Sequence, residues 1–337
     1  MRTIDVNDRA SIGRSSSIAE HLVSPGSADA ESTDDRRQRR RRSRWRAVIL
    51  AGTAATSLWL TGCMERFFYH PTRETTPAPR SVYPQAEVVW FDSADGTRLR
   101  GWFLPSLTTP RDESATIVHL HGNAGSMASH VYFVEYLPAA GFNVFLFDYR
   151  GYGESEGSPW KRGPLIEDAE AALRTARAFP GVDPTRMALF AQSLGGGIAT
   201  IVMASNPDIR SAVLESPLAS WRDVAASTVG GEPPGWWARF LATWLIADGG
   251  STPRPLDAIA TIDRPILILH GDADRVIPAS HGKRLAEAAP NAELVILPGG
   301  EHNTLQSAYP EVRRMIVEFL RSTTAREVPA AASPGEV

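Results

Sequence analysis

Ser193 is the residue of this chain whose surroundings first indicate chemistry. It lies in LFAQSLGGG (189–197), after an apolar run and before a helical pattern. A sharp turn from strand to helix exposes a serine hydroxyl at a sheet edge, and it needs small residues two positions to either side. Ala191 and Gly195 occupy those positions, with Ala where the usual pattern has Gly. Since this pattern alone is common, the assignment of a nucleophile depends on what else the chain supplies.

A serine hydroxyl becomes a good nucleophile only when a base removes its proton, so a histidine is required. Among the histidines that follow Ser193, His270 ends an apolar strand and His281 begins a helix, where structural roles are more common. His302 instead lies in the glycine-rich loop PGGEHN, directly after the last predicted strand. We expect it at the carboxyl edge of the sheet, together with Ser193.

The base in turn needs a carboxylate that fixes its tautomer. HGDADRVIP follows the preceding predicted strand and offers Asp272 and Asp274, and Glu215 after another strand is a third candidate. Spacing does not choose between the two aspartates. The order Ser, Asp, His along the chain is the one seen when this triad is built on a parallel sheet.

Acyl transfer also needs N–H donors for the developing oxyanion. The residue after the nucleophile, Leu194, supplies one backbone N–H. The second should come from the loop after the third strand, where the sequence has HLHGNAGS (119–126). Gly122 and Gly125 allow this backbone to bend closely around a site, and we expect the N–H of Asn123 to be the second donor.

These residues need a scaffold that brings the ends of several strands together. An expected hairpin of 87–91 and 98–104 precedes short, continuous apolar runs, which are typical of strands buried on both faces. Helical patterns such as 165–179 and 280–289 separate them, which predicts a parallel sheet covered by helices on both sides. The apolar runs are 115–120, 143–148, 187–191, 211–215, 265–270 and 292–298.

The connection between 215 and 265 is longer than the others and contains an amphipathic helical pattern. Its apolar face predicts burial, either directly on the sheet or as the roof of a pocket over the strand ends. The two interpretations remain open at this point. The face is formed by two adjoining rows, Trp236, Phe240 and Trp244, and Trp237, Leu241 and Leu245.

The first 63 residues have a different character from the rest of the chain of 337 residues. Residues 1–46 hold eleven Arg against seven acidic residues, so the remainder of a chain of net charge −3 is mildly acidic. Sixteen uncharged residues follow (47–62), and then Cys63, the single cysteine, in LTGC. This order is typical of an export signal, and the end resembles the lipobox of bacterial lipoproteins, in which the cysteine is diacylated. We expect Cys63 to be the lipidation site.

Several alternatives stay open for this region. Residues 47–62 could form a single membrane-spanning helix, although they are shorter than the roughly 20 residues that cross a bilayer comfortably. Residues 1–46 are long for a signal peptide, so they could be a disordered cytoplasmic tail or follow a misassigned start. The arginines could bind RNA or anionic lipid. The acidic remainder argues against a nucleic-acid partner for the folded part.

The motifs HGNAG, DYRGYGESEG (148–157), QSLGG, HGDADRVIP and GGEHN occur in this order in the α/β-hydrolase superfamily, and the chain resembles its bacterial members over roughly 85–321. The resemblance implies an α/β fold with a mostly parallel eight-stranded sheet, helices on both faces and a short helical cap at about 217–262. It also implies that Asp274 is the catalytic acid and that neither a metal nor an organic cofactor is used. The chain shows no metal-ligand cluster or dinucleotide fingerprint.

The sequence therefore predicts five parts: a disordered basic segment (1–46), a signal or anchor (47–63), a tether (64–84), the hydrolase domain (85–321) and a disordered tail (322–337). We expect a membrane-anchored enzyme on the exported side of a bacterial cell envelope that cleaves carboxylic esters of small molecules or lipids. A peptidase, thioesterase or lipid-acyl hydrolase would use the same triad, and a hydrolase fold turned into a binding module is a more distant alternative.

Overall fold

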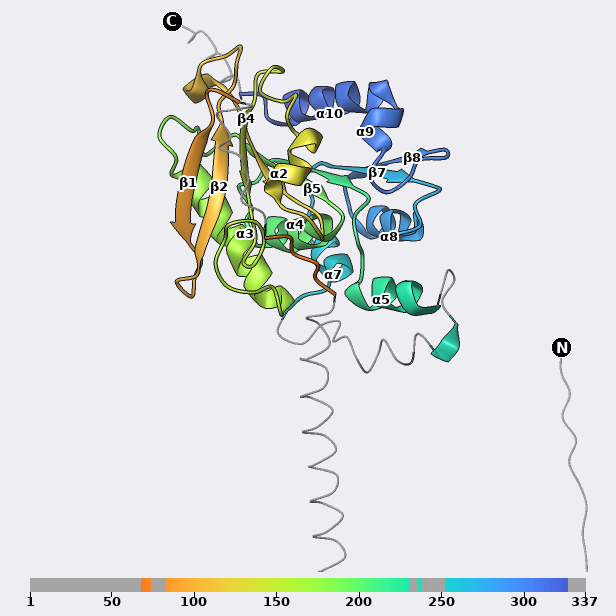
Figure 1. Cartoon of the computed structure of the whole chain (residues 1–337). Coiled ribbons are helices and arrows are strands. Elements are labelled where there is room, and N and C mark those ends of the chain that lie inside the picture. The colour runs from red at the N-terminus through yellow and green to blue at the C-terminus, as the bar shows by residue number, and fades with distance from the viewer. Residues whose placement is uncertain (1–67, 74–82, 231–234, 238–239, 241–251, 327–337) are drawn as a thin grey trace, which may run out of the picture. The chain divides into compact units, whose positions relative to one another are not determined.

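The computed structural model describes residues 68–73, 83–230, 235–237, 240 and 252–326 (Figure 1). The predictions for the basic segment, the apolar segment, Cys63 and most of the C-terminal tail fall outside these residues. Among the described residues, no helix combines the length and apolar character needed to cross a membrane.

One sheet of eight strands organises the described chain, in the order β1-β2-β4-β3-β5-β6-β7-β8. β2 pairs antiparallel with both β1 and β4, and the remaining neighbours are parallel. The predicted fold class is thus confirmed, including the N-terminal hairpin. The strands are β1 (Glu87–Asp92), β2 (Arg98–Leu104), β3 (Thr116–Leu120), β4 (Asn143–Phe147), β5 (Met187–Gln192), β6 (Ser211–Glu215), β7 (Ile266–Gly271) and β8 (Ala292–Leu297).

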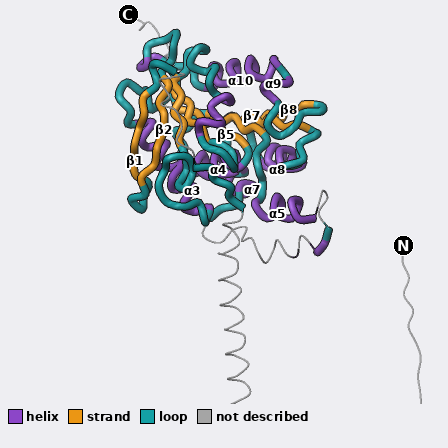
Figure 2. Tube along the Cα trace, viewed as in Figure 1, coloured by secondary structure: helices purple, strands orange, loops and turns teal. Residues whose placement is uncertain are grey.

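Helices cover both faces of this sheet (Figures 1 and 2). α3, α4, α7 and α8 lie on one face, and α2, α9 and α10 on the other. The helices are α2 (Met127–His130), α3 (Arg162–Arg177), α4 (Leu194–Ser205), α5 (Trp221–Gly230), α7 (Pro255–Ile259), α8 (Ser280–Ala288), α9 (Leu305–Ala308) and α10 (Pro310–Thr323), with short 3₁₀ turns η3 (Arg111–Glu113) and η4 (Val131–Phe133).

The central strands are buried at every position because each alternate side chain meets a different helical layer. In β5, Leu189 and Ala191 pack into the core shared with α3 and α4, whereas Ala188 and Phe190 pack into the core shared with α10. Two hydrophobic cores therefore hold the sheet from both sides. This arrangement fixes the carboxyl ends of the parallel strands, where the candidate residues lie.

Only parts of the predicted cap at 217–262 are described. α5 packs Trp221 into the core, and α7 packs Ile259 into it. Three residues of the expected apolar face are exposed, with Trp236 at 81%, Trp237 at 45% and Phe240 at 57%. The prediction that this face is buried is wrong for these three residues, because a helical apolar face is buried only where another surface packs on it. Its other members, Leu241, Trp244 and Leu245, fall outside the described residues.

Candidate active site

Ser193 lies at the turn between β5 and α4, as the sequence predicts, with φ 56° and ψ −116°. A positive φ is costly for a residue with a side chain, and such strain is found mainly at functional sites. The turn is held by a hydrogen bond from the Ser193 N–H to the Glu215 carbonyl oxygen (2.9 Å). A side chain at Gly195 would overlap the carbonyl oxygen of Leu120, so the helix begins against the backbone of β3 and requires glycine there.

Ala191 is completely buried in the core between the sheet and the helices α3 and α4. We expect Ala191→Val to lose about 1–3 kcal/mol of stability by overpacking, and to lower kcat/KM by displacing the turn that carries Ser193. Ala191→Gly should lower the stability by less than about 1 kcal/mol, because it removes only one methyl group and raises the conformational entropy of the unfolded chain. Thermal unfolding and ester hydrolysis of the two variants measure this. Equal losses of activity would mean that the turn does not depend on a small residue at 191.

Ser193, His302 and Asp274 form one hydrogen-bonded chain across the ends of three strands. The Ser193 Oγ lies 2.9 Å from His302 Nε2, and His302 Nδ1 lies 2.7 Å from Asp274 Oδ2. All three residues are less than 9% exposed. With Nδ1–H donating to the carboxylate, Nε2 is left to accept the serine proton. The geometry is that of a nucleophile, a base and an orienting acid.

The hydrogen bonds of Asp274 suit a residue that stays ionised. Burial alone would raise its pKa, but the imidazole rings of His270 and His302 beside the carboxylate outweigh this effect and hold the pKa of Asp274 below its usual range. Its other oxygen, Oδ1, accepts the backbone N–H groups of Val276 and Ile277, each at 2.9 Å. The carboxylate is therefore fixed in orientation as well as in charge.

The other two candidate acids are engaged elsewhere. Asp272 Oδ1 accepts the Gly299 N–H at 2.5 Å, which stabilises the turn after β8. Glu215 is fully buried, and its Oε2 accepts a hydrogen bond from Gln306 Nε2 (2.8 Å). Of the three, Asp274 is the one that contacts His302.

The two histidines that were predicted to be structural differ from each other. The Nδ1 of His281 accepts the Ala219 N–H at 3.0 Å, and burial lowers the pKa of His281 to about 4, so a neutral structural role fits. His270 donates from Nε2 to the Ile277 carbonyl oxygen (2.8 Å) and lies 3.4 Å from Asp274 Oδ2. This second contact was not predicted from the sequence, in which the position of His270 four residues before Asp274 was the available signal.

The predicted oxyanion donors lie on the two segments beside Ser193. Leu194 is the first residue of α4, so its N–H has no acceptor within the helix. Asn123 lies in the loop after β3, where Ala124 (φ 71°) and Gly125 (φ 72°) both have left-handed backbone. A side chain at Gly122 would overlap Gln192 Oε1, so this loop packs directly against the residue that precedes Ser193.

Gln192 is a site residue that sequence reasoning missed. Its Nε2 donates to Asn303 Oδ1 (2.9 Å) and lies 3.4 Å from His302 Nε2. It thereby links the serine turn to the loop that carries the histidine. Its place immediately before Ser193 was the only signal in the sequence.

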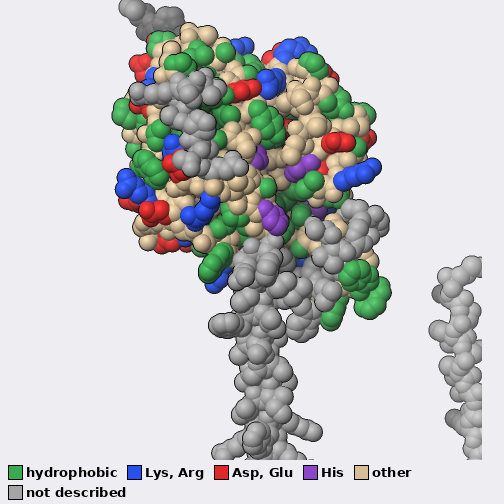
Figure 3. All heavy atoms as spheres, viewed as in Figure 1, with side chains coloured by type: hydrophobic (Ala, Val, Ile, Leu, Met, Phe, Trp, Pro, Cys, Tyr) green, Lys and Arg blue, Asp and Glu red, His purple; other side chains and the backbone are tan. Residues whose placement is uncertain are grey.

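A buried group of titratable side chains lies in and next to the loop at 121–126. Burial lowers the pKa of His119 to about 3, lowers that of His121 well below its usual value and raises that of Asp148 to about 7. Asp148 Oδ1 accepts the Met127 N–H at 2.6 Å, at the start of α2. His119 and His121 are fully buried, so the histidine side chains that Figure 3 shows near the middle of the face turned to the viewer are others.

Asp148 should make the protein less stable as the pH rises from about 4 to about 7. An unfolded Asp ionises near pH 4, whereas the folded Asp148 keeps its proton up to about pH 7. The folded state then binds more protons than the unfolded state, and its stability falls with rising pH across this window. We expect Asp148→Asn to flatten this part of the curve, as measured by urea unfolding at several pH values. An unchanged slope would contradict the assignment.

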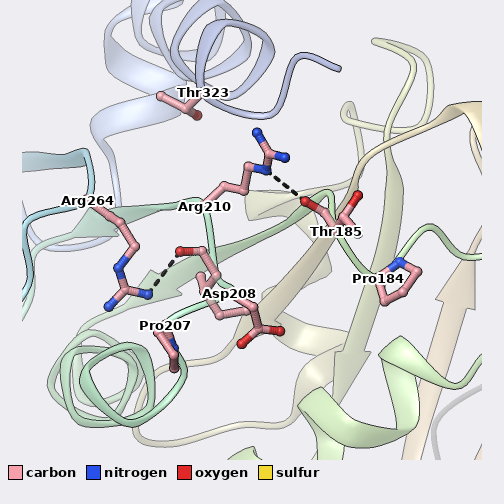
Figure 4. A pocket seen from close by; sticks show the side chains of 8 residues that line it. Pro184, Thr185, Pro207, Asp208, Arg210, Arg264 and Thr323 are labelled. Carbon is pink, nitrogen blue, oxygen red and sulfur yellow. Dashed lines mark hydrogen bonds between the residues drawn. The ribbon is translucent and has the colours of Figure 1, made fainter. Parts of the chain in front are cut away.

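A depression at the amino ends of the parallel strands, opposite the carboxyl ends that carry the site, is a separate feature (Figure 4). It is lined by Pro184, Thr185, Pro207, Asp208, Ile209, Arg210, Arg264 and Thr323, near the amino ends of β5, β6 and β7. Its arginines donate to backbone carbonyl oxygens, from Arg210 to Thr185 (2.7 Å) and from Arg264 to Ile209 (3.0 Å). These side chains tie loops together.

Comparison with known proteins identifies relatives along most of the described chain. A family model described as serine aminopeptidase, S33, matches residues 111–247, and one described as TAP-like protein matches 241–330. The uncharacterized protein YfhR of Escherichia coli is 38% identical over 263 residues, covering 76% of this chain and 87% of its own. The α/β hydrolase domain-containing protein WAV2 of Arabidopsis thaliana is 32% identical, covering 76% and 85%.

Solved structures show the same fold. The esterase Pf2001 of Pyrococcus furiosus superposes with a TM-score of 0.63 at 22% identity, over 76% of this chain and 98% of its own. Est1E of Butyrivibrio proteoclasticus gives a TM-score of 0.55 at 20% identity, over 71% and 99%. These matches, together with the sheet order and the site at the strand ends, show that the chain belongs to the α/β-hydrolase superfamily.

Proposed function

We propose that the protein is a serine hydrolase that cleaves carboxylic esters through an acyl-enzyme. The observation that carries this proposal is the chain of two hydrogen bonds from Ser193 Oγ to His302 (2.9 Å) and from His302 to Asp274 (2.7 Å). A strained serine at a strand-to-helix turn, next to a base with an ionised partner, is the arrangement that activates a hydroxyl.

In the acylation step, Ser193 Oγ attacks the ester carbonyl carbon while His302 Nε2 takes the hydroxyl proton. The carbonyl oxygen becomes negatively charged, and the N–H groups of Leu194 and Asn123 stabilise it. Asp274 accepts the Nδ1–H of His302 throughout, which stabilises the imidazolium without taking its proton. His302 then protonates the leaving alkoxide, and the acyl group remains on Ser193.

Deacylation repeats these roles with water as the nucleophile. His302 removes a proton from water, the hydroxide attacks the acyl carbon, and the same two N–H groups stabilise the second tetrahedral intermediate. Collapse of this intermediate breaks the bond to Ser193 Oγ, which recovers its proton from His302. The products are an alcohol and a carboxylic acid.

A substrate panel tests the reaction class. The full chain is assayed with p-nitrophenyl esters of increasing acyl length, an acyl thioester and aminoacyl p-nitroanilides, each beside the Ser193→Ala variant as background. We expect the esters to have the highest kcat/KM. A peptidase is the second candidate, because one matching family model is described as a serine aminopeptidase. Faster turnover of the anilides than of the esters would favour the peptidase and overturn the esterase proposal.

We further propose that the enzyme is anchored in the membrane on the exported side of a bacterial envelope, with lipid or small-molecule esters as substrates. The order of the arginine-rich segment, the apolar residues 47–62 and Cys63 supports this proposal. We expect Cys63→Ser to release the protein from the membrane fraction, as followed by fractionation and immunoblot. Retention of the variant with an unprocessed N-terminus would favour a spanning helix instead.

A further inference from the structure

We propose that residues 68–73 are a positioning part of the candidate active site, because they hold the loop at 121–126 through the side chain of Asn123. This inference rests on the proposed function, in which the N–H of Asn123 contacts the oxyanion. The segment falls within the predicted tether at 64–84, yet here the chain is packed on the domain. Tyr69 is only 4% exposed.

The segment contacts the loop by backbone and side-chain hydrogen bonds along its length. The Phe68 carbonyl oxygen accepts from Asn123 Nδ2 (2.6 Å), and the His70 N–H donates to Asn123 Oδ1 (3.0 Å). Two residues further on, the Thr72 N–H donates to the Gly125 carbonyl oxygen (3.1 Å). The two backbones therefore run side by side, with a parallel bridge between residues 71 and 125.

The motif at 148–157 holds the same amide from another direction. The Tyr152 hydroxyl donates to Asn123 Oδ1 (2.8 Å), and the Gly153 N–H donates to the Thr72 carbonyl oxygen (2.9 Å). Oδ1 also accepts the Ala124 N–H at 3.1 Å, so three donors converge on it. An amide that is engaged at both ends in this way orients its own backbone and is not available to bind a substrate.

This matters because an oxyanion donor works only where it is fixed before the charge develops. The loop contains two successive residues with left-handed backbone, Ala124 and Gly125, which cost energy unless the surroundings hold them. The bonds to residues 68–72 and to Tyr152 supply that restraint. Losing one of them should let the loop relax and move the Asn123 N–H away from the reacting oxygen.

In the anchored protein proposed above, the contact between residues 68–72 and the loop at 121–126 also limits the distance between the membrane and the candidate active site. Residue 68 follows Cys63 by five residues. A chain of that length spans at most about 18 Å when fully extended. The Asn123 loop is then tied to the membrane surface through a short connection, which suits an ester that is itself a membrane lipid.

Tyr152→Phe is the sharpest test, because it removes one hydroxyl and keeps a buried ring. Tyr149→Phe is the matched control, since the buried Tyr149 hydroxyl has no hydrogen-bond partner among the described residues. One net hydrogen bond corresponds to roughly a tenfold effect. We expect kcat of Tyr152→Phe to fall about tenfold with KM nearly unchanged, affinity for a trifluoromethyl ketone to fall by a similar factor, and Tyr149→Phe to match the wild type.

A second pair tests the segment itself. His70→Pro removes the N–H that donates to Asn123, whereas His70→Ala keeps it, so only the proline variant should lose kcat. Hydrogen–deuterium exchange without substrate gives a readout that does not depend on activity. Peptides covering 68–73 and 121–126 should exchange faster in Tyr152→Phe and His70→Pro than in their controls.

The outcomes separate this inference from the proposed function. Turnover retained by Ser193→Ala overturns the proposed function. An inactive Ser193→Ala protein, combined with equal kcat and equal exchange in Tyr152→Phe and Tyr149→Phe, overturns only the inference. A loss confined to KM, or one explained by a lower melting temperature alone, also contradicts a positioning role. If Tyr152→Phe does not fold, the His70 pair decides in the same way.

Discussion

Replacing Ser193 by Ala is expected to lower kcat for a p-nitrophenyl ester by a factor of about 10⁴ to 10⁶. The variant lacks the oxygen that forms the acyl-enzyme, so only substrate binding and oxyanion stabilisation remain. Folding should be little affected, since the hydroxyl makes one hydrogen bond among the described residues, to His302, and alanine adds no atom to the turn. The variant should also lose labelling by a fluorophosphonate, which modifies activated serines.

Ser216→Ala is the matched control for this experiment. Ser216 follows the next strand of the sheet, has a similarly unusual φ of 47°, and is fully buried. Its Oγ has no hydrogen-bond partner among the described residues. The control should therefore keep turnover and labelling at the wild-type level. If a correctly folded Ser193→Ala protein retained either property, the nucleophile would have to be a different residue.

The sequence allowed the sheet and the strand-end residues to be predicted because both depend on short-range patterns. Continuous apolar runs determine strands that are buried on both faces, and the chain order of such strands limits the possible topologies. Ser193 and His302 each directly follow or adjoin a predicted strand, so their meeting at one edge follows from the fold. The residues alone did not separate Asp274 from Asp272, which differ by two positions in one loop. The family resemblance made that choice, and the hydrogen bond to His302 agrees with it.

Features that depend on long-range backbone contacts could not be predicted in the same way. Residues 68–73 look like an irregular, proline-containing linker, because their contacts with Asn123 and Gly125 use mainly backbone N–H and C=O groups, which every sequence carries. The prediction that Trp236 and Phe240 are buried was wrong for a different reason. A helical pattern shows that an apolar face exists, but it does not show whether the neighbouring core still has room for it.

Asp274→Asn is the second large effect, and it distinguishes an orienting carboxylate from a merely structural one. The Asn Oδ1 can keep the hydrogen bonds from Val276 and Ile277, so the loop should fold as before. Its NH₂ group, however, donates where Asp274 Oδ2 now accepts from His302 Nδ1. The histidine is then favoured in the tautomer with its proton on Nε2, which cannot accept the proton of Ser193. We expect kcat to fall by about 10⁴ with little change in KM.

The stability of Asp274→Asn should also depend on pH differently from that of the wild type. Asp272→Asn is the control for the effects on kcat and on stability. The folded pKa of Asp274 lies below its unfolded value near 4, so the stability it contributes is present above about pH 4 and is lost as the pH falls through the folded pKa. Asp274→Asn should therefore lose stability at neutral pH and show a shallower decline in acid, as followed by urea unfolding. Asp272 contacts the Gly299 N–H and not His302, so its Asn variant should keep kcat. A similar kcat for both variants would mean that His302 does not depend on Asp274 for its orientation, and the roles of the two aspartates would have to be reassigned.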